Sequence, residues 1–333
     1  MSTLFGGVSR QSHAAAFPPD CYYCLLDELP LHLLPRTVDS RLRNENTTEL
    51  YLNAACKLLP ADKLPEAFAY QKDIFSAFAL QGTIALVRDE RTGACLPFWL
   101  DRRLEKAVQG LRLNEPVLAS MPQEVRSVLA AAGILLPRLQ SEQATPETQD
   151  WISKARMSYR EKGYAPLSGL IHPFHVAALR RYYRCLIRKG KIRLGDEQSS
   201  LRYVAHNEPV ARFFHQQIAL ALSAVAGQPL QPSYVYMASY LSGAELKKHV
   251  DREQCEFSIT LCLDFSPEPE LSTPWPICLD RANGKVVVYQ GLGDGLAYRG
   301  TRLPHYREKL GPGQTSTSIF FHYVSADFQG RLD

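Results

Sequence analysis

The chain has 333 residues, of which 45% are hydrophobic and 22% are charged, an ordinary balance for a globular protein of one large or two medium domains. No apolar run reaches the roughly 18 residues that a membrane span needs, and the longest candidate, Phe75 to Val87, contains Gln81. Residues 1–20 lack the apolar core of a signal peptide. We therefore expect a cytoplasmic protein with a flexible N-terminus and no membrane association.

The charge is distributed unevenly along the chain. Residues 1–150 hold 15 Lys and Arg against 18 Asp and Glu, whereas residues 151–333 hold 23 against 16, a net charge of +7. This excess favours an anionic substrate, cosubstrate or partner for the second half. The eight cysteines lie mostly in apolar surroundings and are predicted to be free thiols, and Cys21-Tyr-Tyr-Cys24 lacks the second pair of ligands that a structural zinc site needs.

Residues 21–136 are predicted to form a separate, mostly helical module. Apolar residues recur at helical spacing, and Gly133 is placed to end the last helix. The expected elements are helices at 50–59, 64–80 and 122–132 and a hairpin at 82–100 with its turn at 89–93.

Two strands followed by helices that end in Ala132-Gly-Ile-Leu135 are similar to the winged-helix peptide-binding modules of natural-product pathways. That similarity implies a carrier or precursor peptide as partner. The favoured alternative is an appendage that packs on the rest of the chain or on a second copy in a homodimer.

Residues 137–150 are polar and interrupted by proline, and they are predicted to be a linker. Helices are expected next at 151–162, 174–189 and 207–225. The second of these is rich in arginine, which would suit a nucleic-acid-binding surface. We favour a solvated helix face over nucleic-acid binding.

The remaining residues alternate in the manner of β-strands. Expected strands lie at 233–241, 256–264, 275–279, 285–289, 296–298, 303–307 and 315–324. Several short strands with turn signals and no intervening helix are typical of a jelly roll. The predicted fold class is therefore α+β, with a jelly-roll domain over 151–330 and flanking helices.

The sequence His249-Val-Asp251 is the first candidate for chemistry. Two positions apart on a strand, these side chains point to the same face. His305 precedes the last predicted strand and can complete a set of two imidazoles and one carboxylate, the facial triad that binds non-haem Fe(II). His322 is the main rival to His305, although Phe320-Phe-His-Tyr323 looks more like core.

Tyr240, Gly243, His249 and Asp251 fit Tyr-x-x-Gly-x-x-x-x-x-His-x-Asp, with His305 further along. This order resembles the Fe(II)/2-oxoglutarate-dependent dioxygenases, particularly the prolyl-hydroxylase-like branch, over residues 155–330. The resemblance implies a double-stranded β-helix core that hydroxylates a substrate, with Fe(II), 2-oxoglutarate and O₂ as cofactors and ascorbate as a further candidate. It also implies that Tyr240 contacts the cosubstrate.

The chain departs from this family at the residue that anchors the cosubstrate carboxylate. The family usually places Arg or Lys about ten residues after the second histidine, where this chain has Thr315 in Gly313-Gln-Thr-Ser-Thr317. A hydroxyl cannot replace a charged, bidentate donor. Arg307, which shares a strand face with His305, is our first candidate for the anchor. Arg299 is the second and Arg252 the third, and Thr315 and Thr317 are candidate hydroxyl donors.

The sequence leaves the substrate open. Tyr234 and Tyr236 share a strand face and, with Arg252, are candidates to line its pocket. A small-molecule or peptidyl substrate is favoured, either derived from an amino acid or a natural product. A nucleic-acid demethylase on the same core and a metal-binding jelly roll without turnover are the alternatives.

Overall fold

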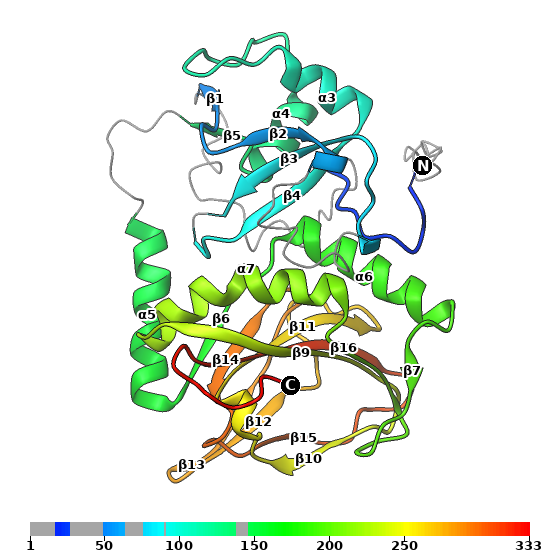
Figure 1. Ribbon diagram of the computed structural model, residues 1–333, viewed down its shortest axis with the longest axis vertical. Coiled ribbons are helices and arrows are strands. Elements are labelled where there is room, and N and C mark those ends of the chain that lie inside the picture. The colour runs from blue at the N-terminus through cyan, green and yellow to red at the C-terminus, as the bar shows by residue number, and fades with distance from the viewer. Residues whose placement is uncertain (1–16, 27–48, 64–75, 90, 138–145) are drawn as a thin grey trace, which may run out of the picture.

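The computed structural model describes residues 17–26, 49–63, 76–89, 91–137 and 146–333, with only the backbone of 146–149. Its larger part is a pair of antiparallel sheets that face each other (Figure 1). The seven-stranded sheet has the order β6 (Tyr164–Leu167), β14 (Gly295–Arg299), β11 (Phe257–Ser266), β16 (Thr315–Ser325), β9 (Leu230–Tyr240), β8 (Arg202–His206) and β7 (Arg193–Leu194). The four-stranded sheet has the order β10 (Leu246–His249), β15 (His305–Arg307), β12 (Ile277–Arg281) and β13 (Gly284–Val288).

Strands β9 to β16 pass back and forth between the two sheets. Strands β9, β11, β14 and β16 belong to the larger sheet, and β10, β12, β13 and β15 belong to the smaller one. All paired strands in both sheets are antiparallel. Eight strands in two such sheets form a jelly roll, as the strand pattern predicts. The space between the sheets is where inward-facing side chains meet.

Three helices lie against the outside of the larger sheet, away from the smaller sheet. They are α5 (Pro146–Lys162), α6 (Pro173–Arg188) and α7 (Pro209–Ala226), and α6 and α7 lie across the larger sheet (Figure 1). A proline at the start of α6 and α7, where no backbone donor is needed, and Gly227 at φ +77° after α7 set their ends. The helix predicted at 151–162 begins earlier, at Pro146, so part of the predicted linker is helical.

The N-terminal part is a mixed structure, and the prediction of a mostly helical module is wrong for its described residues. They form a three-stranded sheet, β2 (Lys57–Pro60), β3 (Thr83–Arg88) and β4 (Cys95–Leu100), and a pair, β1 (Leu50–Leu52) and β5 (Leu135–Pro137). The 3₁₀ turn Ala61–Lys63 and the helices α3 (Arg102–Gln109) and α4 (Gln123–Ala131) complete it.

The hairpin β3–β4 and the helix α4 confirm two of the predictions for this part. The helix expected at 50–59 is instead β1 and β2, because apolar residues in so short a segment suit either structure and distant partner strands decide. Most of the helix expected at 64–80 lies outside the described residues.

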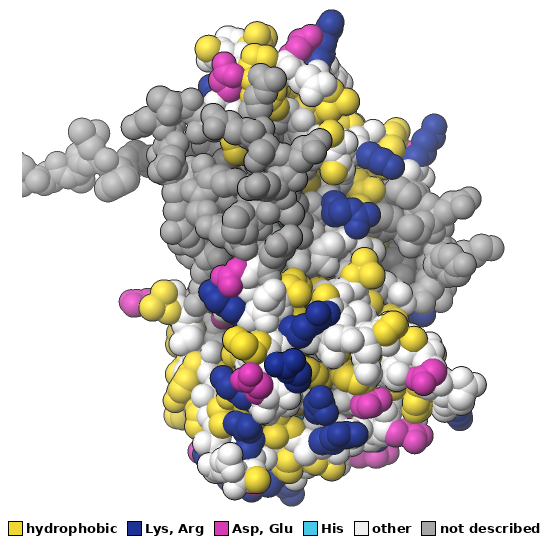
Figure 2. All heavy atoms as spheres, turned by 90° about the vertical axis from the view of Figure 1, so that its left-hand side faces the viewer, with side chains coloured by type: hydrophobic (Ala, Val, Ile, Leu, Met, Phe, Trp, Pro, Cys, Tyr) yellow, Lys and Arg dark blue, Asp and Glu magenta, His cyan; other side chains and the backbone are white. Residues whose placement is uncertain are grey.

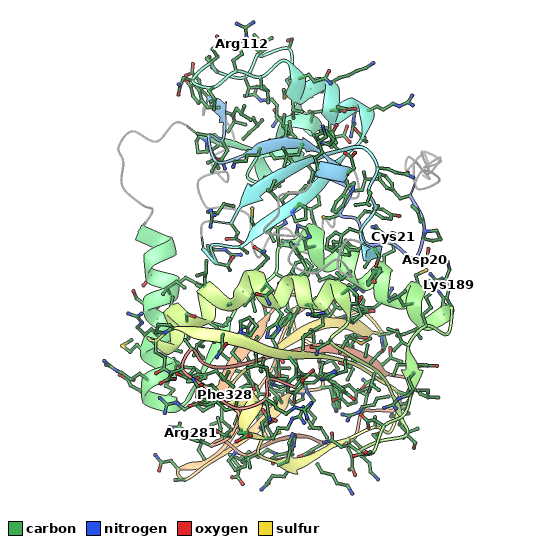
Figure 3. The ribbon with its side chains drawn as sticks, in the orientation of Figure 1. Asp20, Cys21, Arg112, Lys189, Arg281 and Phe328 are labelled. Carbon is green, nitrogen blue, oxygen red and sulfur yellow. The ribbon has the colours of Figure 1, made fainter. Side chains whose placement is uncertain are left out.

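The N-terminal part packs directly on α6 and α7. Buried Tyr22 and Trp99 belong to the same hydrophobic cluster as Phe214 and the barrel residue Ile319. The Tyr22 hydroxyl lies 2.6 Å from Nδ1 of His175 on α6. At the edge of this contact the Asp20 carboxylate lies 3.6 Å from the ammonium group of Lys189. Figure 3 labels both residues where the N-terminal part meets the end of α6. The two parts therefore share one core, consistent with the favoured alternative of an appendage on the barrel.

No helix among the described residues is long and apolar enough to cross a membrane. Figure 2 shows basic side chains gathered on the lower half of the face that α5 covers. Exposed basic residues of α5 include Lys154, Arg156, Arg160 and Lys162. The positive charge of the second half is thus partly displayed on one surface.

Candidate metal centre

The three predicted ligands meet at one end of the space between the sheets. His249 is the last residue of β10, and His305 is the first residue of β15, directly opposite it in the antiparallel register. Asp251 follows β10, and its backbone N–H donates to the Gly300 carbonyl oxygen at 2.8 Å. The structure therefore brings together residues separated by more than fifty positions in the chain.

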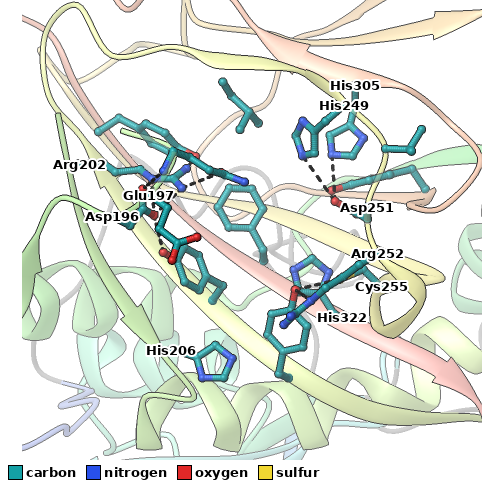
Figure 4. Close-up of a pocket in the computed structure, with 18 of the residues that line it drawn as sticks. Asp196, Glu197, Arg202, His206, His249, Asp251, Arg252, Cys255, His305 and His322 are labelled. Atoms are coloured by element: carbon teal, nitrogen blue, oxygen red, sulfur yellow. Dashed lines mark hydrogen bonds and ion pairs between the residues drawn. The ribbon is translucent and has the colours of Figure 1, made fainter. Parts of the chain in front are cut away.

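The donor atoms of these residues point at a common centre. Oδ1 of Asp251 lies 3.6 Å from Nε2 of His249 and 3.5 Å from Nε2 of His305. One nitrogen of each imidazole and one carboxylate oxygen all lie within 4.8 Å of one another. Figure 4 shows both rings directed at the carboxylate. This is a spacing that a single ion can bridge.

Hydrogen bonds orient both imidazoles for coordination. His249 Nδ1 donates to the Lys247 carbonyl oxygen at 2.7 Å, and His305 Nδ1 donates to that of Leu303 at 3.0 Å. Because a carbonyl only accepts, each Nδ1 carries a proton, and in the neutral ring the lone pair is left on Nε2. Two lone pairs and a carboxylate oxygen therefore face one another, an arrangement that a cation stabilises.

The pKa values of the three groups reflect this arrangement. The hydrogen bond to Asp251 raises the pKa of His249, whereas burial lowers that of His305. Burial opposes ionisation of Asp251, but its interactions with His249, His305 and His322 outweigh burial and lower its pKa. The lowered pKa values favour an ionised Asp251 and a neutral His305, the states that a divalent ion requires, whereas an ion must displace the proton that Asp251 favours on His249.

The Asp251 carboxylate is fixed by its surroundings on the side away from the imidazoles. The Ser258 hydroxyl donates to Oδ2 at 3.1 Å. Gly300 leaves the space for it, since a Cβ at that position would lie 2.4 Å from Oδ2 and 2.2 Å from the Cys255 carbonyl oxygen. Gly300 is thus required by close packing rather than by backbone conformation. Oδ1 is left free to face the imidazoles.

His322, the predicted rival of His305, lies next to the three ligands but not among them. Its Nδ1 is 2.9 Å from the Ser258 hydroxyl oxygen, and its ring lies 4.7 Å from that of Tyr234. Burial lowers its pKa to about 4, which keeps it neutral. The Ser258 hydroxyl lies between His322 Nδ1 and the Asp251 carboxylate and forms a hydrogen bond with each.

Arg307 lies two residues beyond His305, inside the barrel. It is 3% exposed and donates to the Trp275 carbonyl oxygen at 2.5 Å and to Oε1 of Gln290 at 3.1 Å. Its Nε has no hydrogen-bond partner, and no carboxylate among the described residues pairs with it. Burial accordingly lowers its pKa. A buried guanidinium with neutral partners alone is an unusual arrangement and suits an incoming carboxylate.

Tyr240 is fully buried, and its ring packs 5.1 Å from that of Trp275. Its hydroxyl accepts a hydrogen bond from Arg202 Nη1 at 3.2 Å. Arg202 is itself held by Asp196, whose Oδ2 lies 2.9 Å from its Nε and also accepts from the Tyr236 hydroxyl at 2.6 Å. Arg202 and Asp196 were not predicted as site residues, although the turn residues before Arg202 and after His206 signal a strand there.

Three predicted cosubstrate residues lie away from the three ligands. Thr315 and Thr317 line a separate pocket beneath α6, and the Thr317 hydroxyl donates to that of Ser239 at 2.9 Å. Arg299 stacks over the Tyr159 ring of α5 at 5.7 Å, on the face of β14 opposite to inward-facing Tyr298. The structure does not bring these residues together with His249, Asp251 and His305.

A cavity of about 910 Å³ opens onto the three ligands. The predicted substrate residues Tyr234, Tyr236 and Arg252 line it, together with Phe320 and Glu197. Arg252 stacks on the Tyr234 ring at 4.6 Å. The cavity is large enough for a cosubstrate and a second molecule of moderate size.

The pocket beneath α6 has a volume of about 720 Å³ and is lined by arginines of α6, the helix whose composition suggested nucleic-acid binding. Arg180 Nε lies 2.8 Å from Asp264 Oδ1, and Arg184 Nε lies 2.6 Å from its Oδ2. Arg181 Nη2 donates to the Tyr23 carbonyl oxygen at 2.6 Å. These three guanidinium groups have partners within the chain. The expected solvated helix face is wrong for Arg180, which is 7% exposed and paired, and the absence of nucleic-acid binding stays a prediction.

The chain matches no protein-family model and no curated protein. Solved structures with a similar fold include the non-haem α-ketoglutarate-dependent epimerase SnoN from nogalamycin biosynthesis (15% identity, 54% of this chain and 84% of that chain, TM-score 0.45). They also include the carbocyclase SnoK from the same biosynthesis (16%, 57% and 88%, 0.45) and a Pseudomonas putida prolyl-4-hydroxylase (17%, 51% and 98%, 0.43). Similarity at this level identifies neither a reaction nor a substrate, and the prolyl-hydroxylase-like branch stays a prediction.

Proposed function

We propose that this protein is an Fe(II)- and 2-oxoglutarate-dependent oxygenase that hydroxylates an amino-acid, peptidyl or natural-product substrate. The observation that supports it best is the convergence of His249 Nε2, His305 Nε2 and Asp251 Oδ1. Both imidazoles already donate through Nδ1 to carbonyl oxygens, so their lone pairs face the carboxylate. Two imidazoles and one carboxylate are the donor set that leaves open positions on Fe(II).

In this proposal each group of the chain has a defined task. His249, Asp251 and His305 hold the ion on one side, and Ser258 keeps the second carboxylate oxygen occupied. The chemistry that ferrous iron supplies at such a site is activation of dioxygen, coupled to oxidation of 2-oxoglutarate to succinate and CO₂ and of the substrate. The chain provides binding, orientation and a buried setting.

Arg307 is the residue that we assign to the distal carboxylate of 2-oxoglutarate. It is the second residue after His305 on β15, about 6.6 Å further along the strand. Its unpartnered Nε and the unpartnered Ser318 hydroxyl are both buried polar atoms, and polar groups of this kind are costly unless a ligand completes them. Tyr240, held by Arg202, is assigned to the same cosubstrate.

The substrate is assigned to the rest of the cavity. Tyr234, Tyr236 and Phe320 offer aromatic surface, and Arg252 and Glu197 offer one positive and one negative charge. This mixture suits an amino-acid-derived or peptidyl molecule better than a purely apolar one. The N-terminal part is a candidate to bind a carrier or precursor peptide.

The test is the metal-dependent turnover of 2-oxoglutarate. Purified protein with Fe(II), ascorbate and 2-oxoglutarate should release succinate, and chelation should abolish the release. Asp251→Ala should reduce succinate formation at least about 100-fold, because one of three ligands is lost, while circular dichroism shows an intact fold.

Two results would overturn the proposal. Succinate formation that is equal in wild type and Asp251→Ala would exclude these ligands. Tight Fe(II) binding without succinate, across a panel of amino acids, peptides and aromatic natural products, would instead support a jelly roll without turnover.

A further inference from the structure

A second set of donor atoms shares the Asp251 carboxylate. Asp251, Cys255 and His322 each offer one ligand atom, and these atoms lie within 4.8 Å of one another. Cys255 belongs to the turn Glu253–Cys255 and is 1% exposed, whereas His322 comes from β16. The function proposed above uses neither of them as a ligand.

The two sets lie on opposite sides of Asp251. His249 and His305 approach the carboxylate from one side, and Cys255 and His322 lie on the other (Figure 4). Oδ1 faces the first pair, and Oδ2 is the atom that approaches the Ser258 hydroxyl, which in turn contacts His322. The carboxylate is therefore positioned to serve either set.

The second set differs from the first in chemical softness. Two imidazoles and a carboxylate accept Fe(II) or Zn(II), whereas the thiolate of the second set favours Zn(II) and similar borderline-soft ions over Fe(II). Cys255 is a free thiol whose Sγ lies 2.9 Å from the Tyr234 hydroxyl. Nearby Arg252 interacts with that hydroxyl through Nε at 3.3 Å and contributes no ligand.

The Ser258 hydroxyl lies at the centre of the second set. Its oxygen is 3.1 Å from Asp251 Oδ2, 2.9 Å from His322 Nδ1 and 3.2 Å from the Cys255 carbonyl oxygen. Because the hydroxyl has one proton, which it donates to the carboxylate, it accepts from His322 Nδ1 and leaves Nε2 of that ring as the ligand atom.

We propose that Asp251, Cys255 and His322 form a second metal site, selective for Zn(II)-like ions, which competes with the first set for the shared carboxylate. On binding, the ion displaces the proton of Cys255, which passes to solvent, and a metal–sulfur bond forms. An ion in the second set draws Asp251 away from His249 and His305. Zinc excess therefore weakens Fe(II) binding through Asp251, the ligand that the two sets share.

Cobalt(II) is the probe that tests this site, because thiolate ligation gives an intense near-ultraviolet charge-transfer band that nitrogen and oxygen ligands do not give. Metal-free full-length protein is titrated anaerobically with Co(II). The band is expected in wild type and in His249→Ala, which disrupts the first set alone. It should be absent in Cys255→Ala.

Cys278→Ala is the matched control, since Cys278 is a similarly buried thiol, 3% exposed, on strand β12. This variant should keep the band. Calorimetry with Zn(II) should show affinity reduced at least about tenfold in Cys255→Ala and in His322→Ala relative to Cys278→Ala. Thermal melts of all variants identify any that fail to fold.

Two outcomes would overturn the proposal: no charge-transfer band in wild type or His249→Ala at saturating Co(II), or a band that persists in Cys255→Ala. Because the readout is spectroscopic, it does not depend on turnover. A band that requires Cys255 in a protein that makes no succinate would sustain the second site and refute the oxygenase. Succinate formation without the band would do the reverse.

Discussion

Similar side chains lie on the two sides of the large sheet in opposite electrostatic conditions. On the outer face, beneath α6, Asp264 lies between Arg180 and Arg184, and the charges satisfy one another. On the inner side, strands of the smaller sheet face it: there the Arg307 guanidinium of β15 has only neutral acceptors, and Asp251, just after β10, faces the lone pairs of two imidazoles. On the outer side, the charged groups therefore already have partners within the chain.

This difference separates a structural cluster from a binding site more clearly than composition does. The sequence draws attention to the arginines of α6 and to Thr315, where the resemblance to the dioxygenases leads us to expect a cation. In the fold, the arginines are paired and Thr315 faces away from the cavity that the three ligands share. The unbalanced groups, rather than the conspicuous ones, indicate where a ligand belongs.

The largest effect is expected from a substitution that fills the space beside the Asp251 carboxylate. Gly300→Ala places a Cβ 2.4 Å from Asp251 Oδ2, so the carboxylate must shift. We expect about a 100-fold loss of Fe(II) affinity, measured by titration against a competing chelator. Gly311→Ala is the control, because its Cβ meets only the flexible end of Gln314. Unchanged affinity in Gly300→Ala would mean that this packing does not position the ligand.

The next largest effect is expected at Arg307, the buried guanidinium that has only neutral hydrogen-bond partners. Arg307→Met keeps an apolar stem against Trp275 and removes the charge, so the 2-oxoglutarate concentration for half-maximal succinate release should rise by about tenfold or more. Arg299→Met, on the opposite face of β14, should leave it unchanged. If Arg299→Met raises this concentration and Arg307→Met does not, Arg299 is the anchor of 2-oxoglutarate. If only Arg202→Met raises it, the anchor is Arg202, beside Tyr240.

The smallest effect on turnover is expected on the outer face. Asp264→Asn removes the carboxylate that Arg180 and Arg184 share. Because Arg180 keeps Glu268 at 2.6 Å and Arg184 is 52% exposed, the free energy of unfolding should fall by only about 1 to 2 kcal/mol in urea titrations. Succinate release per folded molecule should not change. Asp280→Asn, which removes the exposed partner of Lys248, serves as the comparison and should barely affect stability. A selective loss of turnover in Asp264→Asn would show that the two faces are coupled.

Much of the barrel could be predicted from sequence because alternation and turn residues are local signals. The strands around Tyr240, the His249-x-Asp251 spacing and the position of His305 all follow from such patterns. Their convergence needs only one further assumption, that β10 and β15 pair, and the register shows His249 opposite His305.

The rest depends on pairings that no local pattern reveals. Whether Thr315 or Ser316 faces inward depends on the loop before β16, and a shift of one residue reverses the answer. Arg202 reaches Tyr240 only because β8 pairs with β9. In the N-terminal part, Leu50 becomes a strand residue because Pro137 lies beside it, a contact that helical periodicity could not anticipate.

Strand β15 is only three residues long, yet it bears both His305 and Arg307 on one side. The proposed metal ligand and the buried cation are therefore coupled: a shift of this strand by a single position would turn both side chains out of the barrel together. The neighbouring loops and the cavity wall could change to accept new substrates, but an insertion within this tripeptide would disrupt the placement of His305 and Arg307 in one step.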